Sequence, residues 1–155
     1  MQKLLIESKG IKTDQFFIPP FELRKGDLIV IDIHGGPHYH EFKSILADIF
    51  TGIVKNENLI LKQSLVHDSF FKESKFRRLF FPTTVEQYLE KNANLESEFI
   101  QKIYEFPWAN KKTKLKELYS GYQKIIFLCS TLSKAKDIAF DLAGQNQESA
   151  KFSYE

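Results

Sequence analysis

The hydrophobic positions of this chain fall first into short apolar runs and later recur at helical intervals. Runs at residues 4–6, 16–18 and 58–61 predict short strands in the first half of the sequence. Residues 28–33 form a longer run that is rich in β-branched side chains and almost continuously apolar, which is typical of a strand buried on both faces. A short run at residues 138–140 predicts one more strand near the end.

Helical spacing of apolar residues marks the segments between these runs. From Phe42 onward the pattern predicts a helix that ends at Gly52. Thr83 is followed three residues later by Glu86, which fits a capping box that opens a second helix. Residues 95–106 predict a third helix. Strands and helices together indicate the α/β class.

Composition narrows the class of protein. The 155 residues, 43% of them hydrophobic, suffice for one core, so one domain spanning residues 1–155 is expected. With 22 basic and 20 acidic residues the net charge is only +2, which predicts no nucleic-acid partner and no membrane insertion. The single cysteine, Cys129, excludes an intrachain disulfide. Since neither a signal peptide nor a membrane span is recognisable, we expect a cytoplasmic protein.

Four motifs follow one another along the sequence. They are a unit of turn, strand, glycine turn and helix at residues 24–52, Leu-Phe-Phe-Pro-Thr-Thr-Val at residues 79–85, Leu-Tyr-Ser-Gly-Tyr-Gln at residues 118–123, and the segment 137–149. In the first motif, Lys43 and Ser44 are adjacent and Gly52 follows nine residues after the lysine. In this order the motifs resemble the nucleotide-binding domain of ATP-binding cassette (ABC) transporters, with its phosphate loop GxxxxGK[ST], its LSGGQ signature and its Walker B strand.

The resemblance covers nearly the whole chain. It implies a P-loop NTPase-like (ABC ATPase-like) sheet flanked by helices, with a reduced helical lobe at about residues 68–118. It also implies a place for ATP and magnesium, because a phosphate loop holds both at a helix N-terminus. On spacing alone, Lys43 followed by Ser44 is more often an ordinary helix start than a phosphate ligand, and Asp141 is more often a strand-end or turn residue. The residues that would contact a nucleotide are Gly36, Lys43, Ser44, Ser120, Gly121, Gln123 and Asp141.

Several departures from the family pattern fall on its catalytic machinery. Phe42 stands where the phosphate loop has a glycine, and Glu41 precedes it, so a side chain obstructs the phosphate cradle and a carboxylate repels polyphosphate. Leu142 stands where the family has the glutamate that polarises the attacking water. Tyr122 replaces the second signature glycine, and the segment from Gly144 lacks the aspartate of the D-loop. No catalytic residue is therefore expected, and weak ATP binding or hydrolysis is the alternative.

The loop before Lys43 also suits a metal ion. Histidine and carboxylate side chains are ordinary zinc ligands, and a Gly-Gly-Pro sequence lets a loop fold back on itself. The four side chains that would meet around zinc are His34, His38, His40 and Glu41. Zinc binding and phosphate binding are mutually exclusive uses of this segment, and such clusters also occur in solvated loops.

Aromatic and basic side chains gather in residues 67–78, which predict a loop because they lack clean periodicity, and just beyond them. Aromatic residues and arginine commonly anchor interfaces, so a docking surface is expected; a flap over the core with cations extending into solvent is the alternative. The docking residues are Phe70, Phe71, Phe76, Arg77, Arg78 and Phe80. Together with the degenerate phosphate loop, they predict a non-catalytic ABC ATPase-like binding or regulatory protein that forms a homodimer or docks to an ABC-type subunit.

Overall fold

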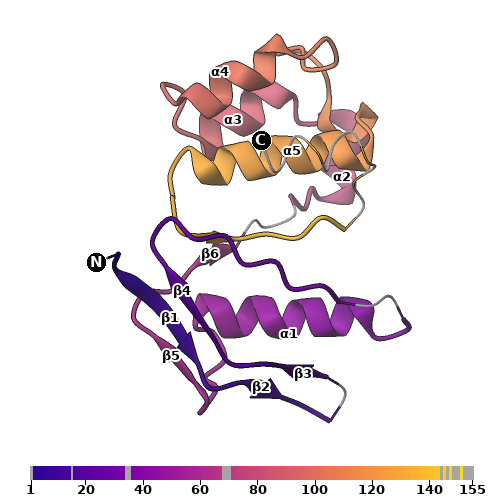
Figure 1. The fold of residues 1–155 in the computed structure, drawn as a ribbon. Helices are drawn as coiled ribbons and strands as arrows, with labels where there is room; N and C mark the ends of the chain where they lie inside the picture. Colours follow the sequence, from indigo (N-terminus) through magenta and orange to yellow (C-terminus); the bar gives the residue numbers. More distant parts are fainter. Residues whose placement is uncertain are drawn as a thin grey trace. The chain divides into compact units, whose positions relative to one another are not determined.

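The computed structural model describes residues 2–14, 16–33, 36–67, 71–143, 145, 147 and 151. The chain forms two compact units, Met1–His67 and Asp68–Glu155, and each unit is described by itself (Figure 1). Short strands and one long helix make up the first unit, whereas helices dominate the second. The mixed α/β composition expected from the sequence is confirmed, and the number of domains stays a prediction.

An antiparallel three-stranded sheet is the central element of the first unit. β1 (Leu4–Ser8) lies in the middle, between β4 (Phe21–Arg24) and β5 (Leu59–Leu61). Leu5 and Ile6 are both buried in this central strand, whose pairing with β4 shifts register between Leu4 and Ile6. The strands predicted from the first and last of the early apolar runs are therefore confirmed.

A small hairpin follows β1 in the chain. It pairs β2 (Ile11–Lys12) with β3 (Phe17–Ile18), and its facing residues Ile11 and Ile18 are both buried. The strand predicted near Phe17 is thus confirmed, although it is only two residues long. β6 (Val66–His67) is the last strand of this unit.

The helix α1 (Tyr39–Thr51) completes the first unit and lies beside the sheet (Figure 1). Its buried side chains are Leu46, Ile49 and Phe50, whose three- and four-residue spacing gives one apolar face. The helix ends at Gly52, which takes the left-handed conformation with φ of 80°. Glycine is the usual residue at such a helix end, because it adopts this conformation without strain. The predicted helix end is therefore confirmed.

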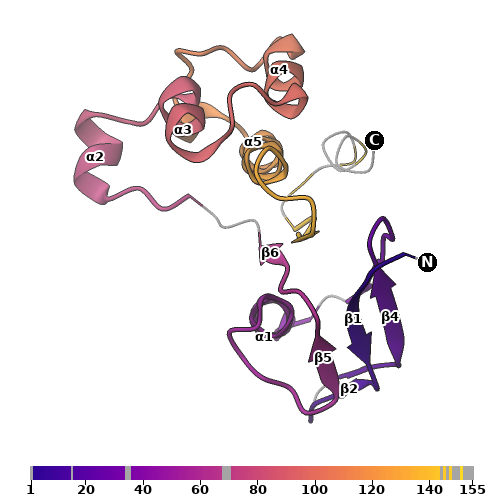
Figure 2. The same ribbon diagram turned by 90° about the vertical axis from the view of Figure 1, so that its left-hand side faces the viewer.

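Helices pack around a central one in the second unit. In chain order the elements are α2 (Lys75–Phe80), α3 (Val85–Asn92), α4 (Glu98–Glu105), the 3-10 turn η1 (Leu115–Glu117), α5 (Ser120–Leu132) and the strand β7 (Ile138–Ala139). α5 packs against α3 and α4, and every residue from Lys124 to Ser130 is buried (Figure 2). A helix buried on all sides is a core helix, so α5 is the element on which this unit is built.

The helix predicted after Thr83 is present, but its capping box lies one residue further along. The Thr84 hydroxyl accepts from Gln87 N–H at 3.3 Å, and the Gln87 side-chain oxygen accepts from Thr84 N–H at 3.2 Å. The predicted pairing of Thr83 with Glu86 is wrong. The reason is that Thr83 is buried and its hydroxyl donates to the Glu73 carboxylate at 2.5 Å, which leaves it unavailable as a cap.

The loop predicted for residues 67–78 is wrong in its second part, because α2 begins at Lys75. Ser74 caps this helix by accepting a hydrogen bond from Arg77 N–H at 3.3 Å. Serine is among the preferred residues at this position, since its hydroxyl satisfies an amide that has no partner within the helix. The helix has only six residues, too few to show a helical period in the sequence.

Residues 28–33 do not form the buried strand that their sequence predicts. Leu28, Ile29 and Val30 are 65%, 36% and 64% exposed, and no described residue pairs with the segment in a β-ladder. A strand buried on both faces needs neighbouring strands and a covering layer on each side. Within the described part of the first unit, the segment lacks those neighbours, so the apolar run remains at the surface.

The thiol of Cys129 provides a test of the α5 core. Its burial raises the pKa of this thiol to about 12, and the Lys102 ammonium opposes the shift by a smaller amount. Because the thiolate is the reactive form, we expect iodoacetamide at about pH 8 to modify the native protein about a thousandfold more slowly than the urea-unfolded chain. Mass spectrometry of time-quenched samples measures both rates. Equal rates would show that the core around α5 opens readily.

Candidate functional site

The start of α1 carries the lysine and serine that the family resemblance assigns to a phosphate loop. The helix begins at Tyr39, and Phe42 N–H already donates to the His38 carbonyl oxygen at 3.0 Å. Lys43 and Ser44 therefore lie one turn inside the helix, and the prediction that they open it is wrong. Backbone N–H groups at such positions donate to carbonyls of the preceding turn. The amides that a phosphate loop directs at its ligand are here used within the helix.

The residues around this helix start do not form a phosphate cradle. A Cβ placed on Gly36 would meet nothing within 4 Å, so no close neighbour among the described residues requires glycine there. Phe42 directly precedes Lys43, where the pattern GxxxxGK[ST] would require a glycine. Its ring packs against Phe16 with centroids 5.2 Å apart and stacks on His38 at 6.0 Å. Without a glycine at this position, the residues before Lys43 continue the helix instead of wrapping around an anion.

A cavity of about 250 Å³ opens beside Phe42 in the first unit. None of its lining residues is basic, and all but one are apolar. They are Phe16, Phe17, Ile18, Ile31, Asp32, Ile33, Phe42 and Leu46. This cavity therefore suits aliphatic or aromatic groups and disfavours phosphate.

The histidine loop brings together only part of the predicted zinc site. His38 Nδ1 lies 3.3 Å from Glu41 Oε2, and both side chains are more than half exposed. The His40 ring instead packs edge-on against Tyr39, with centroids 5.5 Å apart. His34 lies outside the described residues. Within the described ranges, no three His, Cys, Asp or Glu side chains gather as a metal ion would require, and the zinc site stays a prediction.

The signature-like residues lie at the N-terminal end of α5. Ser120 is exposed and Gly121 is buried, and Gln123 N–H donates to the Tyr119 carbonyl oxygen at 3.1 Å. The Gln123 side-chain amide donates to the Leu118 carbonyl oxygen at 2.9 Å. The glutamine therefore holds the helix start to the preceding loop.

Tyr122, in the signature-like segment, is part of an aromatic stack. Its ring lies 4.4 Å from the Trp108 ring with an angle of 5° between the planes. Trp108 in turn stacks on Phe106 at 5.0 Å, and Tyr119 meets Tyr122 edge-on at 6.0 Å. Such pairs add to the packing energy beyond the area they bury. Tyr122 thus fastens the loop after α4 to α5, a role that the sequence does not reveal.

Asp141, the predicted magnesium ligand, is held by a lysine of α5. Lys124 Nζ contacts Asp141 Oδ1 and also donates to the Asp141 carbonyl oxygen at 2.6 Å. The lysine side chain is 3% exposed and the aspartate side chain 13%. Ala143 N–H donates to the same carboxylate at 2.8 Å. The carboxylate is thus neutralised within the second unit, and Lys124 is the residue that sequence reasoning missed. The signal that could have identified it is that Lys124 is the one charged residue in α5, whose other residues are mostly apolar.

The docking residues divide between the core and the surface. Phe71 packs edge-on against Tyr88 at 5.4 Å and near Phe127 at 6.5 Å, so it belongs to the margin of the core. Phe70 lies outside the described residues. Four side chains of α2 and its end are each more than half exposed and form what we name the α2 surface. They are Phe76, Leu79, Phe80 and Phe81. Leu79 and Phe81 were not among the predicted docking residues.

Polar contacts fix α2 in an orientation that leaves its apolar side chains exposed to solvent. The buried Glu73 carboxylate accepts from Thr83 N–H at 2.8 Å, and Arg77 Nε donates to the Thr83 hydroxyl at 3.1 Å. Lys116 Nζ donates to the Arg78 carbonyl oxygen at 3.0 Å. Figure 2 shows α2 at the margin of the second unit, beyond α3. Arg77 thus anchors the helix through its side chain, and Arg78 through its backbone carbonyl.

The described fold is similar to that of a chain of an ABC transporter. That transporter is assigned to the metal-chelate type and was captured in an inward-facing conformation; the TM-score is 0.50 and the sequence identity 17%. The match covers 84% of this chain and 56% of that chain, so this chain spans little more than half of the transporter chain. By sequence, no family model and no curated protein matches. Among the described residues, no helix has the length and apolar character that crossing a bilayer requires.

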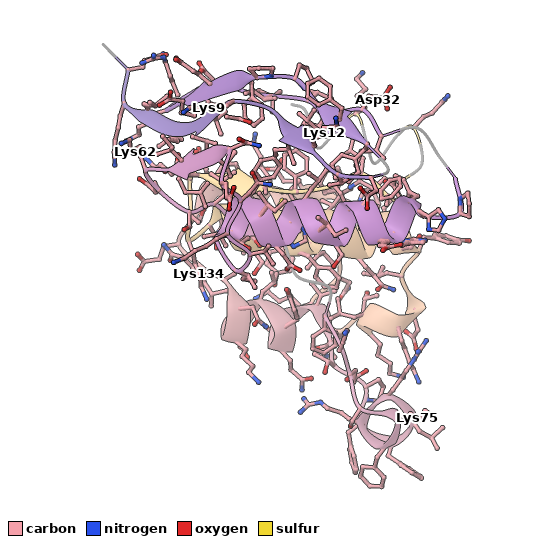
Figure 3. All side chains as sticks on the ribbon, turned by 90° about the horizontal axis from the view of Figure 1, so that it is seen from below. Lys9, Lys12, Asp32, Lys62, Lys75 and Lys134 are labelled. Carbon is pink, nitrogen blue, oxygen red and sulfur yellow. The ribbon has the colours of Figure 1, made fainter. Side chains whose placement is uncertain are left out.

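Replacing Lys124 by methionine should destabilise the protein by about 3–5 kcal/mol, because the change leaves the Asp141 carboxylate buried beside an apolar side chain. Urea unfolding followed by circular dichroism measures the loss. Lys134→Met is the matched control, since Lys134 is an exposed lysine just after α5 (Figure 3). Loss of such a surface charge should cost less than about 0.5 kcal/mol. Equal effects of the two changes would contradict a structural ion pair.

Proposed function

We propose that this chain is a non-catalytic, ABC ATPase-like protein that binds to or regulates another subunit. The observation that carries the proposal is the continuous helix through Lys43 and Ser44, with the Phe42 ring where a phosphate loop has a glycine. A phosphate loop works by directing free backbone N–H groups at its anion. In α1 the amides of Lys43 and Ser44 lie beyond the first turn and are used within the helix, which supports a protein without ATP hydrolysis.

The second unit gives independent support. In an ABC ATPase the carboxylate after the Walker B strand holds magnesium, but the Asp141 carboxylate here pairs with the Lys124 ammonium. Tyr122 occupies, with its ring stacked on Trp108, the place of a glycine whose backbone would approach the γ-phosphate. The alternative function, a weak ATPase, requires α1 to unwind by one turn and Lys124 to release Asp141. Each change would break contacts that stabilise the fold.

The fold similarity supports assembly with other subunits, because the similar chain belongs to a transporter. The α2 surface is the part of this chain best suited to such a contact. Its exposed aromatic side chains pack on one another, with the Phe76 ring centroid 4.9 Å from that of Phe80. Aromatic clusters of this kind, surrounded by arginine and lysine, anchor protein interfaces. We therefore assign the α2 surface to contact with an ABC-type subunit.

Nucleotide binding is the direct test of lost catalysis. We expect about 1 mM Mg-ATP or Mg-ADP to shift the melting temperature by less than about 1 °C, because a ligand must bind the native state to stabilise it. Phosphate release should stay at background in the wild type and in Lys43→Ala alike. Turnover that disappears in Lys43→Ala would overturn the proposal. A parallel titration with zinc separates the metal-binding alternative, which predicts a rise in melting temperature that His38→Ala removes.

Site-specific photocrosslinking tests the docking surface. A benzophenone amino acid in place of Phe80, in the protein expressed in its native source, should crosslink to an ABC-type membrane subunit identified by mass spectrometry. The matched control places the same group at Tyr119, which is also exposed in the second unit. Since crosslinking requires direct contact, the Tyr119 site should give at most about a tenth of that product. The same adducts at both positions, or none at Phe80, would contradict docking through α2.

A further inference from the structure

The cavity beside Phe42 combines apolar walls with one charge. Phenylalanine, isoleucine and leucine side chains form the walls, and Asp32 is the one charged residue among the described residues that line the cavity. Because Asp32 is exposed, it lies at the opening. No described residue forms a hydrogen bond or an ion pair with its carboxylate. The cavity therefore offers a ligand an apolar surface and a carboxylate that has no partner in the described chain.

Three phenylalanine rings line the cavity and favour a cation as well. The ring centroids of Phe16 and Phe42 lie 5.2 Å apart with an angle of 59° between the planes, so these two rings do not stack face to face. Phe17, which is 63% exposed, lines the same cavity. The face of an aromatic ring attracts a cation, and a nearby carboxylate attracts it further. The rings and the carboxylate together favour a positively charged ligand.

The volume of the cavity, about 250 Å³, limits the size of that ligand. An apolar protein cavity of about 150 Å³ holds one benzene molecule. The volume here therefore admits one aromatic ring, or an aliphatic group of similar size, together with a short chain that reaches the opening. A small molecule fits these dimensions, whereas a folded partner protein does not.

We propose that this cavity binds a small organic cation, in which an ammonium group is attached to one aromatic or aliphatic group. The apolar group lies between β3 and α1, which supply Ile18 and Leu46 to the walls, and the ammonium group lies at the opening beside Asp32. Transfer of the apolar group out of water supplies most of the affinity, and the carboxylate selects the charge. Binding requires neither a nucleotide nor a partner subunit, so this site is independent of the proposed function.

Probes of one shape and different charge test the site. They are 2-phenylethylamine, which is protonated at about pH 7.5 as a lysine side chain is, the alcohol 2-phenylethanol, and the anion phenylacetate. Each is titrated into ¹⁵N-labelled protein, and the amide chemical shifts are followed by NMR. We expect the amine to bind with a dissociation constant of about 1 mM, since a ligand this small buries little area.

The affinities should follow the charge of the probe. The alcohol should bind about fivefold more weakly than the amine, because an exposed ion pair and a cation–π contact each contribute only a small factor. Phenylacetate should bind most weakly, since Asp32 repels it. Ethylamine, which has the charge but no ring, should give no saturable shift up to about 10 mM, because it has little apolar area to bury. The shifts should be largest at lining residues such as Ile18, Ile33 and Leu46.

Asp32→Asn separates the charge from the shape of the cavity. The change keeps the size of the side chain, so the alcohol should bind as it does to the wild type, whereas the amine should lose its advantage of about fivefold. Glu57→Gln is the matched control, because Glu57 is an exposed carboxylate of the same unit that does not line the cavity. This control should bind all three probes like the wild type.

The proposal is overturned by an amine that gives no saturable shift, by phenylacetate that binds as tightly as the amine, or by shifts that gather away from the lining residues. An amine advantage that persists in Asp32→Asn would also overturn it. Should Asp32→Asn fail to fold by circular dichroism, the comparison of the three probes on the wild-type protein decides.

Discussion

The second unit depends on a buried lysine. An ammonium group withdrawn from water loses several kilocalories per mole of hydration, and the loss is recovered only through a well-placed anion. Lys124 lies in the middle of α5, among residues that pack against α3 and α4. The buried Lys124 ammonium therefore requires a carboxylate within contact distance, and Asp141 provides it. The ion pair with Lys124 therefore fixes the position of the chain after α5 at Asp141.

A comparable constraint acts in the first unit through the absence of glycine. A chain wraps around an anion only where its backbone is free of side-chain obstruction. With Phe42 packed against Phe16, the lowest-energy course for the preceding residues is to continue the helix back to Tyr39. In both units, residues that the sequence resemblance assigns to a nucleotide site take part in packing or in an ion pair.

The sequence predicted the local elements well where the signal was itself local. The helix that ends at Gly52 and the strand β1 follow from spacing and from a residue with one preferred conformation. The sequence failed where the outcome depended on distant neighbours. Residues 28–33 have every property of a buried strand, but burial depends on what lies alongside. For the site, Lys43 and Asp141 were identified as positions, but their surroundings are set by Phe42 and Lys124, whose partners lie far away in the sequence.

The stack of Phe106, Trp108 and Tyr122 has a practical consequence. Trp108 is the only tryptophan in the chain, and it lies between two rings that join the loop after α4 to α5. Its ultraviolet emission therefore reports on the second unit alone, because the first unit has no indole. Comparison of that emission with the loss of backbone ellipticity during heating distinguishes melting of the two units as one cooperative body from melting in separate steps. Tyr122 thus holds in place an optical probe of the protein's own cooperativity.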